Sequence, residues 1–376
     1  RSGSRPAASS ARDSSPSNMD RPRAGCTGGI ALGRSPLSFK ERARVRMGPV
    51  NSLPSLLSFQ GVGRDFDVSR PWLERTLGRL PRKTLVAVDD VTFEIPKGRT
   101  LALVGESGCG KSTVGRLAVG LHAPSRGHVR FDGQDVAQLK GTTGSEIRRR
   151  MQMIFQDPYA SLNPRWRVED IVAEPLRAHG LVSSRDDARR RVGELLEQVG
   201  LSAADARKFP HQFSGGQRQR ISIARALSSS PEFLVCDEPT SALDVSVQAQ
   251  VLNLMRDLQT RLGLTFLFIS HNLAVVEYVA DIIGVMYLGR IVELGPTAEV
   301  LTSPVHPYTR MLLAAIPDLE MTGTPRTPVA GEVPSPIDRP DGCAFHPRCP
   351  SATDVCWKQV PEVRVVEGVR VACYHA

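Results

Sequence analysis

Short apolar segments rich in β-forming residues alternate with longer amphipathic stretches from about residue 55 onward. The clearest amphipathic stretch is 245–262, in which apolar residues recur at steps of three and four and so share one face of a helix. Alternation of this kind predicts an α/β domain with a largely parallel sheet. The segments that we predict to be strands are 100–105, 128–132, 233–237, 264–270 and 282–288.

Composition and hydrophobic periodicity divide the chain into three regions. Residues 1–54 are rich in Ser, Arg, Pro, Gly and Ala without periodicity, and we expect a disordered N-terminal extension there. The α/β domain is expected over 55–318, with a charge-rich and mostly helical subdomain at about 140–230 that shows no strong strand pattern. Residues 319–376 read as a Pro/Gly-rich linker followed by a small Cys-rich C-terminal extension.

Charge and hydropathy exclude two classes of protein. No apolar run approaches the ~20 residues that a membrane-spanning helix needs. The formal net charge is +9, but residues 1–46 hold ten Lys/Arg and only three Asp/Glu, so the remaining chain is nearly neutral. A nucleic-acid-binding body would carry its basic residues on the folded part, and we therefore expect no nucleic-acid partner.

The first chemical motif is a glycine-rich loop between an expected strand and an expected helix. It matches the pattern G-x-x-x-x-G-K-[ST], in which glycines let backbone N–H groups enclose a polyphosphate. The lysine carries a positive charge to the outer phosphates, and the next hydroxyl can bind Mg²⁺. The residues of this loop are Gly105, Glu106, Ser107, Gly108, Cys109, Gly110, Lys111, Ser112 and Thr113.

A second motif follows about 120 residues later, where the apolar strand 233–237 ends in two acids, Asp237 and Glu238. Ligands bind at the carboxyl edge of parallel strands. Asp237 suits the coordination shell of Mg²⁺, and Glu238 is placed to orient or deprotonate an attacking water molecule. The two motifs together predict a P-loop nucleoside-triphosphate hydrolase.

The segment 213–217, Phe-Ser-Gly-Gly-Gln, resembles the L-S-G-G-Q signature of the ATP-binding cassette family, with Phe213 in place of the usual Leu. Serine followed by two glycines and a helix also reads as a second helix start able to bind an anion. The resemblance implies a P-loop cassette fold with a helical signature subdomain. It also implies an ATP site shared by two subunits, to which the signature contributes Ser214, Gly215, Gly216 and Gln217.

The resemblance assigns further roles by position. Catalytic roles fall on Lys111, Glu238, Gln156 of the Q-loop and His271 of the switch, after which Asn272 replaces the usual Asp. The D-loop position is Asp244, and Phe66 is the candidate to stack on adenine. The expected Mg²⁺ ligands are Ser112, Gln156 and Asp237.

Within this family, the segments 83–90, 153–164, 286–289, 306–310 and 342–350 are similar to the ATP-binding subunits of bacterial oligopeptide/dipeptide importers. The resemblance implies a peripheral subunit on the cytoplasmic face of the inner membrane. Its partners would be two transmembrane permeases, a second and related ATPase chain, and an extracytoplasmic solute-binding protein. Nickel or another small solute remains an alternative cargo, and a soluble cassette ATPase acting on nucleic acid or the ribosome is a further alternative.

Four of the seven cysteines lie in the last 34 residues. We expect a reducing setting, in which clustered thiols more often bind a metal than form disulfides. The spacing is compatible with tetrahedral zinc, an iron–sulfur cluster or free thiols. Resemblance to the peptide-importer branch implies a [4Fe–4S] site formed by Cys343, Cys349, Cys356 and Cys373.

Overall fold

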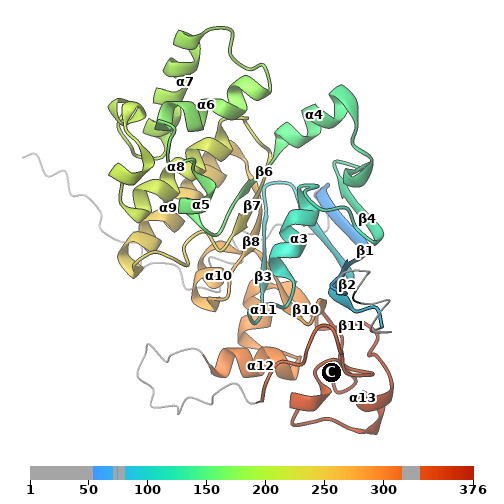
Figure 1. Cartoon of the computed structure of the whole chain (residues 1–376). Coiled ribbons are helices and arrows are strands. Elements are labelled where there is room, and N and C mark those ends of the chain that lie inside the picture. The colour runs from blue at the N-terminus through green and yellow to red at the C-terminus, as the bar shows by residue number, and fades with distance from the viewer. Residues whose placement is uncertain (1–53, 71–73, 75–80, 316–330) are drawn as a thin grey trace, which may run out of the picture.

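The computed structural model describes residues 54–70, 74, 81–315 and 331–376. The predicted extension at 1–54 therefore lies almost wholly outside the described residues, as does part of the predicted linker. Figure 1 shows a central sheet and a group of helices at one end of the molecule. The C-terminal segment, 331–376, lies at the other end with α13 (Asp354–Lys358) and β11 (Arg364–Val366). None of the helices in the described ranges is both long and apolar enough to cross a membrane.

The larger sheet has eight strands in the order β11-β12-β10-β9-β3-β8-β7-β6. The five strands from β9 to β6 pair in parallel, and β10, β12 and β11 add antiparallel neighbours at one side. The predicted parallel sheet is thus confirmed for its central part. The strands are β3 (Thr100–Val104), β6 (Met151–Ile154), β7 (Phe233–Asp237), β8 (Thr265–Ile269), β9 (Ile282–Tyr287), β10 (Arg290–Pro296), β11 (Arg364–Val366) and β12 (Val369–Val371).

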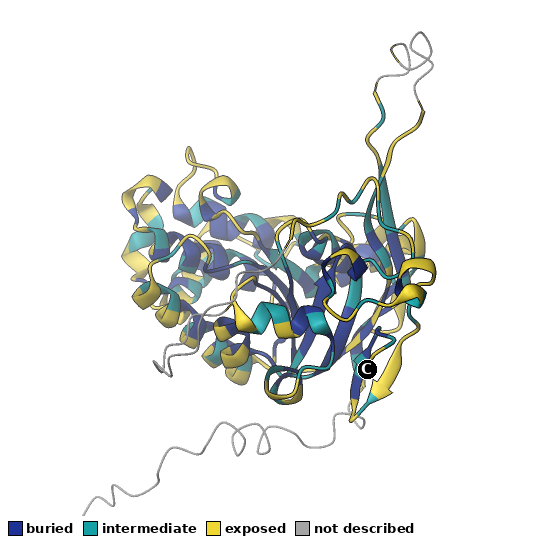
Figure 2. Ribbon diagram, turned by 90° about the horizontal axis from the view of Figure 1, so that it is seen from below, coloured by how far each residue is buried: buried dark blue, intermediate teal, exposed yellow. Residues whose placement is uncertain are grey.

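Every residue of β3, β7 and β8 is buried, and the alternation of side chains along each strand builds two cores. Leu101 and Leu103 face one core, and Ala102 and Val104 face the other. The burial pattern is visible in Figure 2, where the strands are dark blue and the outer faces of the helices are yellow. The central strands can therefore present side chains to a ligand only at their ends, where the chain leaves the sheet.

A second, four-stranded antiparallel sheet, in the order β2-β1-β4-β5, covers one of these cores. The segment 128–132 does form a strand, as predicted, but as β4 it belongs to this antiparallel sheet rather than to the parallel one. In β4 only Val129 and Phe131 are buried, whereas every residue of β3, β7 and β8 is buried, so β4 has the alternating pattern of a strand with one covered face. The strands are β1 (Ser55–Asp67), β2 (Thr84–Pro96), β4 (Arg126–Phe131) and β5 (Gln134–Asp135).

Helices flank the sheets and include the predicted helix 245–262, which is α9 (Val245–Leu262) with the same bounds. The region 140–230, predicted to be mostly helical with no strong strand pattern, does contain one short strand, β6, which pairs in parallel with β7. Four residues with two half-buried positions are too few to produce a strand signal. The α-helices before β7 are α3 (Lys111–Ala118), α4 (Gly141–Arg150), α5 (Pro158–Ser161), α6 (Val168–Ala178), α7 (Arg185–Gln198) and α8 (Gly215–Leu227).

The C-terminal segment packs onto the body of the molecule, because β12 pairs with β10 and extends the main sheet. Phe345 is fully buried and packs against Tyr287 and Tyr308 with ring centroids 5.3 and 5.4 Å apart. The remaining helices are α10 (Leu273–Val279), α11 (Thr297–Thr302), α12 (Pro307–Ala314) and α13 (Asp354–Lys358), and short 3₁₀ turns include η5 (His346–Arg348). The C-terminal segment therefore shares a core with the strands that carry the site.

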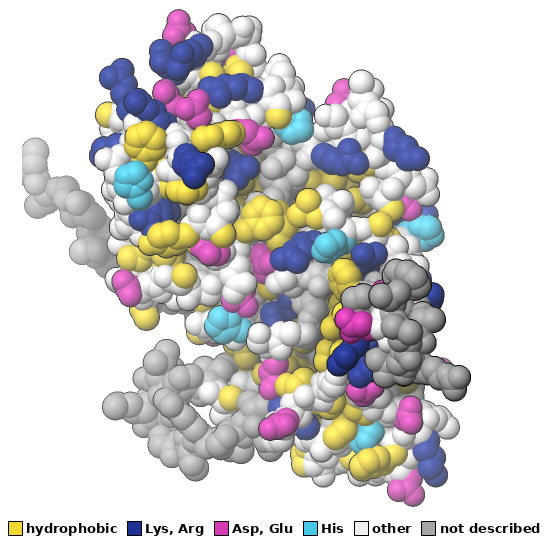
Figure 3. All heavy atoms as spheres, viewed as in Figure 1, with side chains coloured by type: hydrophobic (Ala, Val, Ile, Leu, Met, Phe, Trp, Pro, Cys, Tyr) yellow, Lys and Arg dark blue, Asp and Glu magenta, His cyan; other side chains and the backbone are white. Residues whose placement is uncertain are grey.

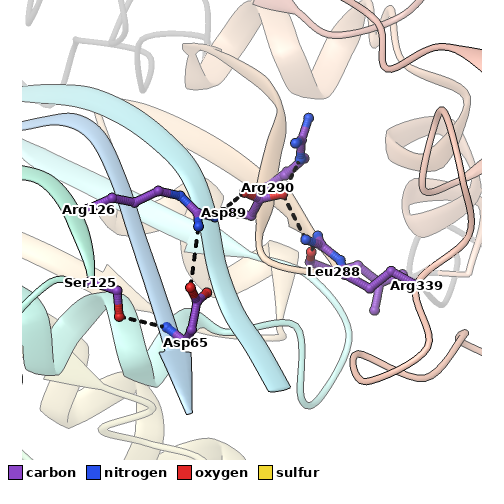
Figure 4. A network of polar contacts seen from close by, with 7 residues as sticks. All are labelled: Asp65, Asp89, Ser125, Arg126, Leu288, Arg290 and Arg339. Carbon is purple, nitrogen blue, oxygen red and sulfur yellow. Dashed lines mark hydrogen bonds and ion pairs between the residues drawn. The ribbon is translucent and has the colours of Figure 1, made fainter. Parts of the chain in front are cut away.

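Asp89 on β2 joins three regions of the chain (Figure 4). It accepts hydrogen bonds from Arg126 on β4, from Arg290 Nε at 2.7 Å and from Arg339 Nη1 at 2.7 Å. Burial raises the pKa of Asp89, but the hydrogen bonds and charges of Arg290 and Arg339 outweigh it and hold that pKa below its ordinary 3.8. The small sheet, the main sheet and the C-terminal segment thus meet at one carboxylate.

We predict that Asp89→Asn lowers the free energy of unfolding by about 2 kcal/mol at neutral pH, because three arginines lose their shared anion. Since the folded pKa lies below the unfolded value of 3.8, the contribution is complete above that value and is lost as pH falls through the folded pKa. Denaturant unfolding at several pH values measures this. Asp90→Asn, at an exposed neighbour, is the control. Equal losses in both variants would contradict the prediction.

Candidate functional site

The glycine-rich loop leaves β3 and enters α3, as the sequence predicts. Its backbone is enclosed by other strands. A Cβ atom at Gly105 would lie 2.1 Å from the carbonyl oxygen of Met286, and one at Gly110 would lie 2.2 Å from that of Ala87. Gly110 also adopts a φ of 107°, which L side chains rarely adopt. The loop can therefore follow this path only with glycine at both positions.

Lys111 is buried, with 5% of its surface exposed, and its ammonium group points back into the loop. The Nζ atom donates to the carbonyl oxygens of Gly105 and Glu106 at 2.7 and 2.9 Å. A lysine ammonium is a compact charge whose donors can exchange one oxygen acceptor for another. The loop thus holds a positive charge at its centre, next to the backbone N–H groups at the start of α3.

Ser112, the second residue of α3, lies against the end of β7. Its Oγ donates to Asp237 Oδ1 at 3.0 Å, and only 3% of Asp237 is exposed. Burial raises the pKa of Asp237, and the nearby charge of Glu238 acts in the same direction. A hydroxyl and a poorly solvated carboxylate are the hard oxygen ligands that Mg²⁺ accepts, so the donor set fits this ion.

Glu238, directly after β7, lies between two of the other predicted catalytic side chains, Gln156 and His271. Gln156 Nε2 donates to Glu238 Oε2 at 3.0 Å, and His271 Nδ1 lies 3.2 Å from the same oxygen. Glu238 has a φ of 44°, in the left-handed region, and its N–H donates to the carbonyl of Ile269 on β8. Three chain segments far apart in the sequence are therefore brought to one carboxylate oxygen at the edge of the sheet.

The signature segment 213–217 forms a capped helix start. Ser214 Oγ accepts from the N–H of Gln217 at 3.3 Å, and Gln217 Oε1 accepts from the N–H of Ser214 at 3.0 Å. Phe213 is buried in the core, and a Cβ at Gly216 would lie 2.3 Å from Cγ1 of Val247 on α9. The turn is thus fixed by its neighbours. Asp244 occupies the N-cap position of α9 without a side-chain hydrogen bond to that helix.

Phe66 lies near the end of β1 and is half-buried. Its ring makes an edge-to-face contact with His122 at 5.6 Å, and the guanidinium carbon of Arg64 lies 4.6 Å from its centroid. An aromatic ring with an accessible part can stack on a nucleobase. These contacts leave the adenine role of Phe66 a prediction.

The four C-terminal cysteines lie in one small region. The N–H of Cys343 donates to the carbonyl of Cys356 at 2.8 Å, and the N–H of His375 donates to Cys373 Sγ at 3.4 Å. Burial raises the pKa of the Cys343 thiol, and the proximity of Cys356, Cys373 and Cys349 raises it further. Across the described ranges, however, no group of three or more His, Cys, Asp or Glu residues has an arrangement that could hold a metal ion. The predicted metal site is therefore not supported by this geometry.

A groove of 310 Å³ opens between the helical part and β6. Phe155, next to Gln156, lines this groove, whereas Leu162 is buried in the core and Tyr159 is exposed. Other residues of the lining include Leu121, Met153, Pro175, Ser222 and Arg225.

Two residues that contact the phosphate loop had no predicted role. Tyr308 on α12 accepts a hydrogen bond from the N–H of Glu106, and Arg348 on η5 forms an ion pair with the Glu106 carboxylate. They belong to the segments 306–310 and 342–350, which mark the importer branch. Their position in those segments was the only sequence signal for a functional role. Nothing in the local pattern links them to a loop about 200 residues away.

Comparison with known proteins gives two family matches. The family described as ABC transporter matches residues 88–241, and the oligopeptide/dipeptide transporter C-terminal region matches residues 292–356. A di/tripeptide transport ATP-binding protein of Pseudomonas aeruginosa is 46% identical over 86% of this chain and 98% of its own length. An oligopeptide transport ATP-binding protein of Bacillus subtilis is 46% identical over 85% of this chain and 97% of its own length.

Solved structures agree on the fold. A dimeric ATP-binding cassette in a post-hydrolysis state with ADP and Pi is 26% identical, with a TM-score of 0.56, and the match covers 64% of this chain and 98% of that one. A cassette from Clostridium perfringens, part of an ABC transporter complex, gives 26% identity and a TM-score of 0.55 over 66% and 91% of the two chains. This chain belongs to the ATP-binding cassette transporter family, in its oligopeptide/dipeptide importer branch of ATP-hydrolysing subunits.

We predict that Gly110→Ala destabilises the chain by more than about 2 kcal/mol, because the added methyl group meets the carbonyl of Ala87 and the loop must shift. Nucleotide affinity should fall with it. Gly108→Ala is the matched control: its φ is 79°, but a Cβ there meets no atom within 4 Å, so only about 1 kcal/mol of backbone strain is expected. Thermal unfolding compares the two, and equal midpoints would refute the steric argument.

Proposed function

We propose that this chain is the ATP-binding and ATP-hydrolysing subunit that energises a bacterial importer for dipeptides and oligopeptides. Two features support this proposal: the convergence of Gln156 and His271 on Glu238, and the match of residues 292–356 to the C-terminal region of oligopeptide/dipeptide transporters. We place the ATPase domain at 55–318 and the linker with the Cys-rich region at 319–376.

The triphosphate of ATP would lie in the loop formed by residues 105–113, with Lys111 as the cation for its outer phosphates. Ser112, Asp237 and Gln156 would hold Mg²⁺, which neutralises phosphate charge and supplies electrostatic stabilisation when bound. The hydrogen bond between Ser112 and Asp237 supports this assignment, since it already places both oxygens together.

Glu238 would accept the proton of the attacking water molecule. Gln156 and His271 both contact Oε2 of Glu238 and so orient its carboxylate. His271 would also contact the terminal phosphate as the reaction proceeds. Asn272, in place of the family's usual Asp, accepts from the N–H of Ala274 at 3.0 Å and caps α10. The substitution therefore retains a local structural role and removes no catalytic group.

We further propose that two cassettes pair head to tail, so that Ser214, Gly215, Gly216 and Gln217 of one chain complete the phosphate site of the other. Asp244 would lie at the same interface, and Phe66 would stack on the adenine base. The capped helix start at Ser214 supports the pairing, because it offers N–H donors without a lysine of its own. The dimeric state of the related post-hydrolysis cassette supports it too.

The groove beside α6 and β6 would receive a helix from a permease. The full assembly would hold two permeases, a second related ATPase chain and an extracytoplasmic solute-binding protein, with this chain on the cytoplasmic face of the inner membrane. The apolar side chains of Leu121 and Phe155, which are 56% and 40% exposed, support docking at this groove.

The alternative functions are less well supported. Nickel or another small solute is not favoured, since the related proteins are named for peptides. Action on nucleic acid or the ribosome is not favoured by the charge distribution. Figure 3 shows basic and acidic side chains intermixed at the end of the molecule where Figure 1 places α6 and α7. Arg190, for example, pairs with Asp187 and Glu194.

We predict that Glu238→Gln lowers ATP turnover by at least about 100-fold, because the variant cannot accept a proton from water. ATP binding should persist, and the paired cassettes should stay closed with ATP bound. Phosphate release and size-exclusion chromatography with Mg·ATP measure the two effects. Glu277→Gln, at an exposed carboxylate of α10, is the control and should retain turnover. Normal turnover in Glu238→Gln would remove this residue from the catalytic role.

We also propose that Cys343, Cys349, Cys356 and Cys373 together hold a [4Fe–4S] cluster, with zinc as the alternative. The resemblance of 342–350 to the peptide-importer branch motivates this proposal, because in the described part of the chain the four thiols are not arranged as a metal site. The thiols would have to lose their protons and bind as thiolates, which the raised pKa of Cys343 opposes. A cluster would cross-link a short segment that has little core of its own.

Metal analysis of anaerobically purified chain tests this proposal. About four irons per chain are expected for one cubane cluster held by four cysteines. The variant Cys356→Ser should lose the iron, whereas Cys236→Ser, at a cysteine buried in β7, should retain it. Absence of both iron and zinc from the parent chain would contradict the proposal and show that the four cysteines are free thiols.

A further inference from the structure

Glu106 is the residue of the phosphate loop at which the C-terminal part of the chain makes contact. Its N–H donates to Tyr308 Oη at 3.0 Å. Its carboxylate accepts from Arg348 Nη1 at 2.6 Å and from Nη2 at 3.0 Å. Its carbonyl accepts from Lys111 Nζ at 2.9 Å. The backbone donor, the backbone acceptor and the side chain of Glu106 therefore each have a defined partner.

These contacts are shielded from water. The Arg348 side chain is 2% exposed and Tyr308 is fully buried. The hydrogen bonds to Glu106 raise the pKa of Arg348, and burial raises the pKa of Tyr308, so one stays charged and the other neutral. Two parallel N–H···O bonds between a guanidinium and a carboxylate fix orientation as well as charge. Arg348 thus both orients the Glu106 carboxylate and neutralises it.

Both partners of Glu106 are themselves held firmly. His306 Nδ1 accepts from the N–H of Tyr308 at 3.0 Å, and burial lowers the pKa of His306 to about 4, so it remains neutral. Buried Glu293 on β10 accepts from the N–H of His306 at the start of α12. Arg348 also contacts Tyr287 Oη at 3.4 Å.

A second contact lies on the same side of the loop. Arg339 donates to Asp89 and to the carbonyl of Leu288 at the turn between β9 and β10 (Figure 4). The next residue, Gly289, donates its N–H to the carbonyl of Cys109 in the phosphate loop at 2.9 Å. The C-terminal segment therefore supports the loop directly at Glu106 and indirectly at Cys109.

We propose that Arg348 is a positioning residue for nucleotide binding, and that the segment 331–376 serves the ATP site by neutralising and fixing Glu106. The loop at 105–113 must accept a polyanion. Without Arg348, the Glu106 carboxylate would remain as an uncompensated negative charge on the loop that must accept the phosphates, and it would oppose their binding. Arg348 bonds to Glu106 and Tyr287, whereas Gln156 and His271 bond to Glu238, so nucleotide affinity and the chemical step should respond separately.

The proposal rests on the proposed function only in taking a magnesium nucleotide as the ligand. The test uses the full chain and Mg·ADP as the probe, with calorimetry for the dissociation constant and steady-state kinetics for ATP. Arg348→Met should weaken Mg·ADP binding roughly tenfold and raise KM for ATP similarly, with kcat nearly unchanged. The added change Glu106→Gln should recover most of the lost affinity, because the unpaired charge is gone. Arg348→Lys should lie between the parent and Arg348→Met.

The control is Arg364→Met, which removes a hydrogen bond to the carbonyl of Cys373 within the same segment and leaves Glu106 untouched. It should bind Mg·ADP within about twofold of the parent chain. Parent-like affinity in Arg348→Met, or a loss that Glu106→Gln does not recover, would overturn the positioning role. If Arg348→Met does not fold, failure of the folded Arg348→Lys to weaken binding overturns it instead. A parent chain without ATPase activity would instead refute the proposed function.

Discussion

The backbone of the phosphate loop is tightly packed at Gly105 and Gly110, and the rest of the site depends on that constraint. Gly105 and Gly110 press against the carbonyls of Met286 on β9 and Ala87 on β2. These two strands come from different sheets, so both sheets together restrict the path of the loop. The loop in turn fixes the start of α3 and brings Ser112 to Asp237. The shape of the nucleotide site therefore depends on how the two sheets pack together.

Electrostatics adds a second level to this arrangement. The loop carries a positive charge on Lys111 and a negative charge on Glu106. Buried Arg348 of the C-terminal segment neutralises the charge of Glu106. Outside the loop, the Asp89 carboxylate pairs with three arginines, which come from the small sheet, the main sheet and the C-terminal segment. Charges that are poorly solvated must be paired, and pairing across distant segments makes the folded parts interdependent. The C-terminal region is thus part of the site's framework.

Motifs with fixed spacing were predictable from the sequence because the residues that bind or react lie next to one another in the chain. The loop at 105–113 lies between a strand and a helix as expected, and α9 has the predicted bounds. The strand β6 was missed because four residues carry no periodic signal, and β4 was assigned to the wrong sheet because alternation does not specify a partner. Long-range pairs such as Glu106 with Arg348 are set by the tertiary fold, which periodicity does not encode.

The central claim is that this chain drives a peptide importer. Its most direct test is to purify the tagged chain from the membranes of the cell that makes it and to identify its companions by mass spectrometry. We expect two permeases, a second cassette subunit and an attached solute-binding protein. ATP hydrolysis by this complex should rise when the binding protein carries a peptide. Recovery with ribosomes or nucleic acid and without a permease would contradict it, and only the ATPase assignment would then stand.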